Sequence, residues 1–181
     1  MRPLLLLLIL LLAPAIPAVD LHLGAYVGGK QGDSDLQPVD QQFEYGLQAH
    51  VRPPIMPVGI QANWFEARRN GDSDLADVSQ RLVTNELQLG LGRVFDPLVL
   101  IHPFIAAGVN RVILNSENTG AVETSETASA WGYWAQGGAF CSLGLMEIGV
   151  VVGWSRADVE LNDTTINAGG KRLGLILGVG F

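Results

Sequence analysis

The last ten residues of the chain, 172–181, read RLGLILGVGF. Every second position of this stretch is apolar, and the positions between carry Arg172, Ile176 and glycines. Apolar residues that recur with a period of two predict a β-strand with one apolar face. The apolar positions are Leu173, Leu175, Leu177, Val179 and Phe181.

Seven further segments upstream repeat this alternation. They cover residues 19–28, 43–52, 58–65, 86–92, 105–110, 133–140 and 146–155. The connections between the eight predicted strands alternate in character. Short or proline-bearing connections lie at 53–57, 96–103 and 142–144, and longer, polar and acidic ones lie at 31–42, 69–81, 116–129 and 157–170. This layout is typical of an up-and-down antiparallel barrel.

The composition narrows the class of protein. A length of 181 residues suits one domain, and 48% hydrophobic against 16% charged residues excludes a disordered chain. The net charge of −7 argues against a nucleic-acid partner. A single cysteine, Cys141, excludes both an intramolecular disulfide framework and a cysteine-rich zinc site.

Residues 1–18 have the three parts of a secretory signal peptide. Arg2 supplies the positive charge, residues 4–12 form an unbroken apolar run, and small residues and prolines follow as far as Ala18. As a helix, the apolar run would cover about half of a ~30 Å hydrocarbon core, which makes a membrane anchor the weaker interpretation. We predict cleavage after Ala18, where strand alternation begins, with Ala15 as the alternative that the −3 spacing favours. The mature domain then spans residues 19–181.

The two faces of the predicted strands decide between a soluble and a membrane barrel. One face is almost wholly aliphatic, whereas a soluble barrel or sandwich of this size needs its apolar face inside. The other face mixes glycines with Glu44, Gln48, Gln61, Glu86, Gln88, Asn110, Gln136, Glu147 and Arg172. Aromatic residues gather where the apolar face meets the long loops, as in the girdle of a membrane barrel. They are Phe43, Tyr45, Trp64, Trp131, Tyr133 and Trp154. We therefore predict an all-β, eight-stranded transmembrane β-barrel.

With its leader, its eight amphipathic strands and its terminal Phe181, the chain resembles the small bacterial outer-membrane barrels of the OmpA-transmembrane, OmpX and OmpW kind. Residues 173–181 are similar to the C-terminal strand signal that the barrel-assembly machinery reads. Residues 102–109, HPFIAAGV, resemble the opening of a barrel hairpin. The resemblance implies a Gram-negative outer membrane, with both termini and the short turns in the periplasm and the long loops outside. It also implies contacts with outer-membrane lipids and lipopolysaccharide, and a monomer.

Charged residues on the inward face form the first candidate site. Glu44, Glu86 and Arg172 are placed near the outer ends of their strands, and buried charges are costly unless they are paired. We expect a polar lumen cluster, joined by Gln48 and Gln136, that plugs the lumen or acts as a gate. A narrow channel for ions or small solutes is the alternative, although eight strands leave a lumen just wide enough for side chains. The side chains expected to fill it are Tyr26, Phe65, Trp134, Phe140, Val151 and Ile176, with Phe104 free to face either way.

A histidine pair is the second candidate site. The hairpin around residues 31–42 makes His22 and His50 cross-strand neighbours on the inward face. A metal or proton site is one interpretation. Two histidines with Asp20 as the only obvious third ligand make a poor metal site, so we expect hydrogen-bonded histidines and no metal or other cofactor. His102 is expected in a short turn, in solvent.

The long loops carry twelve of the 18 acidic residues. We expect solvated loops, with cation bridging to lipopolysaccharide phosphates as the alternative. The motif GDSDL at residues 32–36 recurs at 71–75, through hairpin duplication or turn chemistry. Some barrels of this size modify lipid A with a serine, a histidine and a carboxylate at the outer end. All three histidines here fall at the other end, so we predict a structural or surface-interaction protein and not an enzyme.

Overall fold

Ten β-strands make up the described part of the protein. The computed structural model describes residues 19–32, 41–72, 79–95, 100–119, 124–161 and 164–181. The strands are β1 (Asp20–Gln31), β2 (Gln41–Arg52), β3 (Gly59–Asp72), β4 (Ser79–Val94), β5 (Ile101–Thr119), β6 (Thr124–Leu143), β7 (Met146–Arg156), β8 (Asp158–Leu161), β9 (Thr164–Asn167) and β10 (Gly170–Gly180). The predicted leader lies outside the described residues, as does most of each GDSDL motif. No helix within these ranges is long and apolar enough to cross a membrane.

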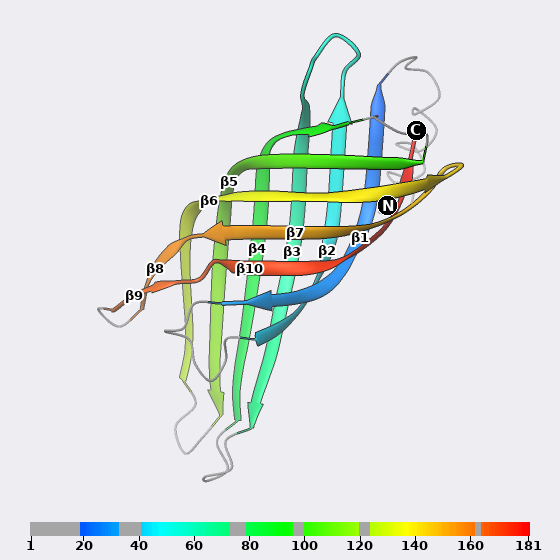
Figure 1. The fold of residues 1–181 in the computed structure, drawn as a ribbon. Coiled ribbons are helices and arrows are strands. Elements are labelled where there is room, and N and C mark those ends of the chain that lie inside the picture. The colour runs from blue at the N-terminus through cyan, green and yellow to red at the C-terminus, as the bar shows by residue number, and fades with distance from the viewer. Residues whose placement is uncertain (1–18, 33–40, 73–78, 96–99, 120–123, 162–163) are drawn as a thin grey trace, which may run out of the picture.

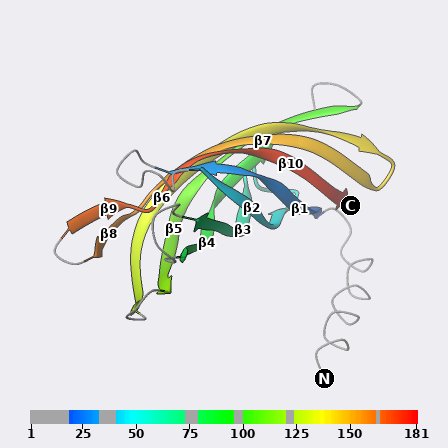
Figure 2. The same ribbon diagram turned by 90° about the horizontal axis from the view of Figure 1, so that it is seen from below.

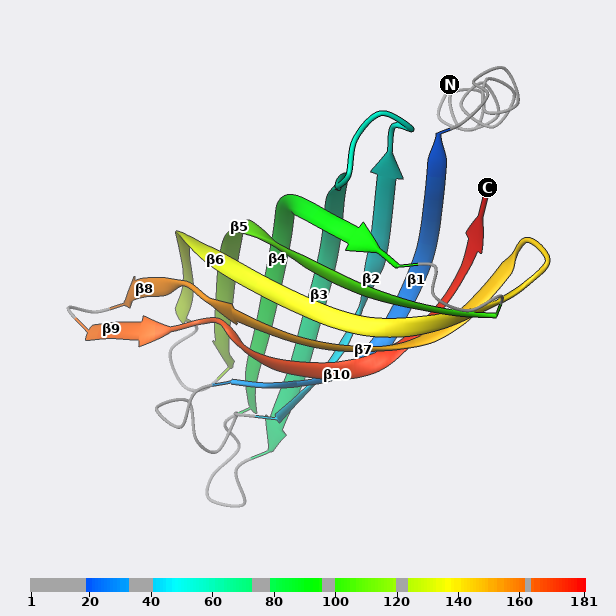
Figure 3. The same ribbon diagram turned by 45° about the horizontal axis from the view of Figure 1, so that its top comes forward.

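Eight of the strands close into a barrel with the order β1-β10-β7-β6-β5-β4-β3-β2 (Figure 1). All neighbouring pairs are antiparallel, and the pair β1–β10 closes the ring. Figure 3 shows the strands β6, β7 and β10 crossing the opposite wall at a steep angle, as tilted strands of a closed barrel do. The predicted eight-stranded up-and-down barrel is confirmed.

The two ends of the barrel differ. β1 begins where β10 ends, and Leu21 and Phe181 exchange backbone hydrogen bonds of 3.1 and 2.9 Å there. The short turn between β6 and β7 lies at this same end (Figure 3). We call it the terminal end, and we call the opposite end the loop end.

The alternation predicted from the sequence separates an aliphatic outside from a polar inside. In β10, Leu173, Leu175 and Leu177 are 63%, 54% and 57% exposed. Arg172 belongs to the same strand, which lies between β1 and β7, and it is 3% exposed. The same division holds in β4, where Leu87 and Leu89 face outward and Glu86 and Gln88 are buried. The exposed surface is therefore the more apolar one, which is the inverse of a soluble barrel.

Among the described residues, two apolar clusters lie in the lumen. Towards the terminal end, aromatic and aliphatic side chains pack together: Tyr26, Phe65, Val94, Phe104, Phe140 and Val151, with Ile176 against them. At the loop end, Val112 packs with Ala157, Val159 and Ala168. Phe104, which the sequence left free to face either way, points inward and is buried.

Several connections differ from the sequence prediction. β3 extends to Asp72 and β4 begins at Ser79, so about half of the loop expected at 69–81 is a continuation of their ladder. β5 and β6 extend to Thr119 and from Thr124, so most of the loop expected at 116–129 is a continuation of their ladder. The loop expected at 157–170 contains the hairpin β8–β9, which extends beyond β7 and β10 (Figure 2). Val159 of β8 is buried in the loop-end apolar cluster, and this burial stabilises strands too short to show a periodic pattern.

A further difference concerns His102, whose prediction as a solvated turn residue is wrong. It lies in β5, it is only partly exposed, and its ring stacks on Phe140 with centroids 5.3 Å apart. Pro103 misled the prediction, because a proline argues against a strand. Here Pro103 pairs with Ala139 in the β5–β6 ladder, and its carbonyl accepts a hydrogen bond from Phe95 N.

Candidate functional site

Glu86 is the centre of a buried ionic cluster in the lumen. Its Oε2 accepts hydrogen bonds from Arg172 Nη2 at 2.5 Å, Ser155 Oγ at 3.2 Å and Lys30 Nζ at 3.4 Å. The side chains of Glu86, Arg172 and Lys30 are 1–2% exposed. Lys30 also donates to the carbonyl of Ala168 at 3.2 Å, which joins the cluster to the loop-end apolar cluster.

Glu44 is the second carboxylate of this cluster. Its Oε1 lies 3.7 Å from Arg172 Nη2, so one guanidinium stands between two carboxylates. The guanidinium carbon of Arg172 lies 4.0 Å from the centroid of the Phe65 ring. With Lys30, the cluster contains two carboxylates and two cations, and its formal charge is balanced.

The structure brings together Glu44, Glu86 and Arg172, as the sequence analysis expected of them. One predicted position differs: Glu86 lies at the middle of β4 rather than near its outer end, because β4 extends back to Ser79. Lys30 is a member that was not predicted, although it continues the alternation of the first strand two residues beyond its predicted end.

A chain of side-chain amides leads from the ionic cluster towards the terminal end. Gln88 Nε2 donates to Glu86 Oε1 at 2.7 Å, and Asn63 Nδ2 donates to Gln88 Oε1 at 2.8 Å. Gln61 Nε2 donates to Asn63 Oδ1 at 2.7 Å, and Gln61 Oε1 lies 3.1 Å from Nδ1 of His50. Because a carboxylate only accepts hydrogen bonds, Glu86 fixes the direction of every bond in this chain.

The two other predicted members of the polar cluster lie apart from its charges. Gln136 Oε1 accepts from Asn63 Nδ2 at 3.5 Å, so Gln136 joins the amide chain. Gln48 is buried and lines a cavity near the terminal end instead. The alternation predicts which residues face inward. It does not predict their height along the barrel, because that height depends on the stagger between strands.

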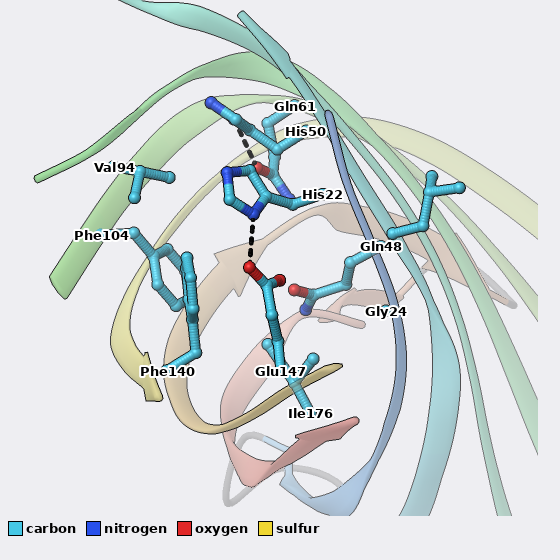
Figure 4. Close-up of a pocket in the computed structure, with 11 residues that line it drawn as sticks. His22, Gly24, Gln48, His50, Gln61, Val94, Phe104, Phe140, Glu147 and Ile176 are labelled. Atoms are coloured by element: carbon cyan, nitrogen blue, oxygen red, sulfur yellow. Dashed lines mark hydrogen bonds and ion pairs between the residues drawn. The ribbon is translucent and has the colours of Figure 1, made fainter. Parts of the chain in front are cut away.

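The cavity near the terminal end has a volume of about 40 Å³ and contains the histidine pair (Figure 4). His22 and His50 are directly opposite each other in the β1–β2 ladder, as predicted, and their ring centroids are 5.9 Å apart. A larger mouth of about 310 Å³ adjoins it and shares His22, Phe140 and Glu147 with it.

The expectation that no carboxylate other than Asp20 lies near the pair is wrong. Asp20 forms an ion pair with Arg52, its cross-strand neighbour. Glu147 of β7 instead reaches across β10, and its Oε1 lies 2.9 Å from His22 Nδ1. The alternation placed Glu147 on the inward face, but no hairpin fixes β1 relative to β7, so this contact could not be predicted from the sequence.

The outer surface carries the predicted aromatic residues on two parts of the wall. Tyr45 contacts Phe43 and Trp64, with ring centroids 6.4 and 6.2 Å apart, and Tyr133 contacts Trp154 at 5.4 Å. Trp131 is 71% exposed and lies beneath the Arg111 guanidinium. Tyr45 Oη donates to Glu66 Oε1 at 2.8 Å, and Arg68 pairs with the same carboxylate.

No group of three or more His, Cys, Asp or Glu side chains in the described ranges is arranged to hold a metal ion. Cys141 is a free, partly exposed thiol. Of the acidic residues predicted in the long loops, several lie outside the described residues, and Asp158 and Glu160 lie in β8.

Comparisons with known proteins identify the fold. No family model matches the chain, and no curated protein matches its sequence. Among solved structures, the Neisserial surface protein A is similar with a TM-score of 0.60 and 11% identity, over 90% of this chain and 97% of that one. The attachment invasion locus protein Ail of Yersinia pestis and the N-terminal β-barrel domain of Pseudomonas aeruginosa OprF each have a TM-score of 0.57 and 14% identity, with the same coverage. The chain therefore has the fold of small eight-stranded outer-membrane barrels.

Proposed function

We propose that this chain is an integral outer-membrane protein with a structural and surface-interaction role. The observation that carries the proposal is the inversion of polarity, with aliphatic side chains exposed around the wall and ion pairs enclosed within it. In lipid, a sheet must close so that every backbone polar group is paired, and this one closes. The same proposal includes export through the predicted leader, assembly through the C-terminal strand and a periplasmic location of the terminal end.

The lumen supports a plug rather than an open pore. The ionic cluster lies between the two apolar clusters, and Glu86 alone accepts from four elements besides its own strand: β1, β5, β7 and β10. Breaking a buried ion pair costs about 3–5 kcal/mol, so thermal opening of this cluster is rare. A narrow channel is the competing function, and planar-bilayer recording separates the two. We expect no stepwise conductance from the purified barrel, whereas steady single-channel steps would support the channel.

The loop-end half of one wall presents a surface for lipopolysaccharide. Three exposed cations on β5, β7 and β10 are each the direct cross-strand neighbour of an exposed aromatic residue. The pairs are Arg111–Trp131, Arg156–Tyr133 and Lys171–Trp154. Aromatic rings lie at the membrane interface, and cations beside them reach headgroup phosphates. We call these six residues the basic–aromatic patch, and its chemistry fits the phosphates of lipid A.

A stability measurement tests this surface. Lipopolysaccharide added to the barrel in detergent should raise its melting temperature, and the double variant Arg111→Gln, Lys171→Gln should lose most of that rise. Arg93→Gln is the matched control, because Arg93 lies over Phe95, 5.2 Å from its centroid, at the terminal end. An equal loss in the control, or no loss in the double variant, would remove lipid A from the proposal.

The proposal assigns no catalytic role to the barrel. His22 and His50 line the terminal-end cavity, and His102 lines the mouth beside it, so none reaches the loop end where lipid A lies. The main experiment is fractionation of cells that express the full chain. We expect the protein in the outer-membrane fraction, with heat-modifiable migration on a gel. Recovery from the soluble periplasmic fraction would overturn the proposed function.

A further inference from the structure

We propose that His22 and His50 bind one divalent transition-metal ion, Zn²⁺ or Cu²⁺, through their Nε2 atoms, with water completing the coordination. The two side chains are a direct cross-strand pair on the inner face of β1 and β2. Their ring centroids are 5.9 Å apart. A metal bonded to imidazole lies about 2 Å beyond the nitrogen, so two rings at this separation can share one ion after small side-chain adjustments.

The hydrogen-bond chain determines which nitrogen of His50 is available. Gln61 must donate its amide hydrogens to Asn63, because the chain ends on the carboxylate of Glu86. Gln61 therefore presents its oxygen to His50 Nδ1, which must carry the hydrogen. Nε2 of His50 is left with a lone pair, and this is the tautomer that binds a metal.

That lone pair is buried and has no hydrogen-bond partner among the described residues. His50 is 5% exposed and lines the 40 Å³ cavity. A side chain at residue 59 would block this nitrogen, since a Cβ on Gly59 would lie 2.6 Å from Nε2. A buried acceptor without a partner is costly in an apolar setting, and a metal ion or a water molecule would satisfy it.

His22 is prepared in the same way by a different group. Its Nδ1 lies 2.9 Å from Glu147 Oε1, and a carboxylate that holds one imidazole nitrogen orients the other towards a metal. Figure 4 shows the second nitrogens of both rings on the side away from Glu147. The negative charge of Glu147 also favours a cation at this position.

The site is accessible from the terminal end. The His22 side chain is 23% exposed and lines both the small cavity and the 310 Å³ mouth. An ion can therefore enter from the terminal end without any change in the ionic cluster, which lies closer to the loop end. Because the described residues offer no group of three ligands, water from the mouth must supply the remaining positions.

Titration of the refolded, tag-free barrel in detergent micelles tests the proposal, in a Cys141→Ser background that removes the free thiol. We expect one equivalent of Zn²⁺ by calorimetry and, with Cu²⁺, an electron paramagnetic resonance spectrum with hyperfine coupling to two imidazole nitrogens. His22→Gln and His50→Gln should each abolish the 1:1 binding, and the copper spectrum should retain coupling to one nitrogen at most. His102→Gln is the matched control, because His102 shares the mouth but not the pair, and it should change neither readout.

A second variant separates binding from folding. Gln61→Leu keeps both histidines but removes the group that fixes the His50 tautomer, so it should weaken Zn²⁺ binding by about tenfold. Heat-modifiable migration verifies that each variant forms the barrel. Absence of stoichiometric binding, binding that survives in both histidine variants, or equal loss in His102→Gln would overturn the proposal and leave adventitious surface binding only.

Discussion

At the scale of single residues, Arg172 lies between the two buried carboxylates, with its Nη2 2.5 Å from Glu86 Oε2 and 3.7 Å from Glu44 Oε1. Alternation assigns Glu44, Glu86 and Arg172 to one face, and the cost of burying a lone charge demands that they meet. Lys30 and the contact of Glu147 with His22 were not predicted, because both residues lie at strand ends, where their partners depend on the stagger of strands that no hairpin connects. Register within a hairpin was predictable, as His22 and His50 show, but register across the barrel was not.

Arg172→Ala should lower the free energy of unfolding by about 3–5 kcal/mol, because it leaves Glu44 without its cation and removes the 2.5 Å bond to Glu86. Urea unfolding in lipid vesicles, followed by tryptophan fluorescence, measures this. Lys171→Ala, one residue away but exposed, should change it by only about 0.5 kcal/mol or less. Equal effects of the two substitutions would mean that Arg172 is solvated.

Gly180→Ala should break the contact between His22 and Glu147. A Cβ at residue 180 would lie 2.3 Å from Glu147 Oε1 and 3.2 Å from His22 Nδ1, so the carboxylate must move. We expect a loss of about 1–3 kcal/mol in unfolding free energy. Gly29→Ala is the control, because the nearest atom to its added Cβ, Gln42 O, is 3.9 Å away. A Gly180 variant as stable as the Gly29 variant would show that this contact contributes nothing.

At the scale of elements, the sequence predicts the eight barrel strands but misplaces several ends. The alternation of apolar and polar residues ends where one face of a strand is no longer buried. The ladder of backbone hydrogen bonds continues beyond that point, as in β5 and β6. The hairpin β8–β9 was missed for another reason. Four residues are too few for a periodic pattern, and the hairpin depends on packing of Val159 against Val112, which is remote in the sequence.

The strand β10 also carries the predicted assembly signal, whose five apolar residues face outward or lie at its terminal end. Phe181→Ala should slow assembly in cells, because it removes the terminal aromatic ring but keeps the backbone bonds to Leu21. Pulse-chase labelling, with the folded fraction scored by heat-modifiable migration, measures the rate. Phe181→Tyr should assemble at the normal rate. Equal rates for all three proteins would contradict a role for this residue as a recognition element.

At the scale of the whole molecule, the main feature is the division between an aliphatic outer surface and a charged lumen. The exposed wall is aliphatic and the lumen is charged, so the outer surface is suited to apolar surroundings. This division could be predicted from the sequence, because the prediction needs only the period of the apolar pattern and the composition of each face. The register between β1 and β10 and the heights of the ion pairs were beyond it, since they are set by the shear of the closed barrel.

The most direct test of this division is a spin-label scan along residues 172–177 of β10, in a Cys141→Ser background and in lipid vesicles. We expect labels at 173, 175 and 177 to collide readily with lipid-soluble oxygen, and labels at 172, 174 and 176 not to do so. A flat profile, or ready access of a water-soluble relaxation agent to the odd-numbered positions, would contradict the division.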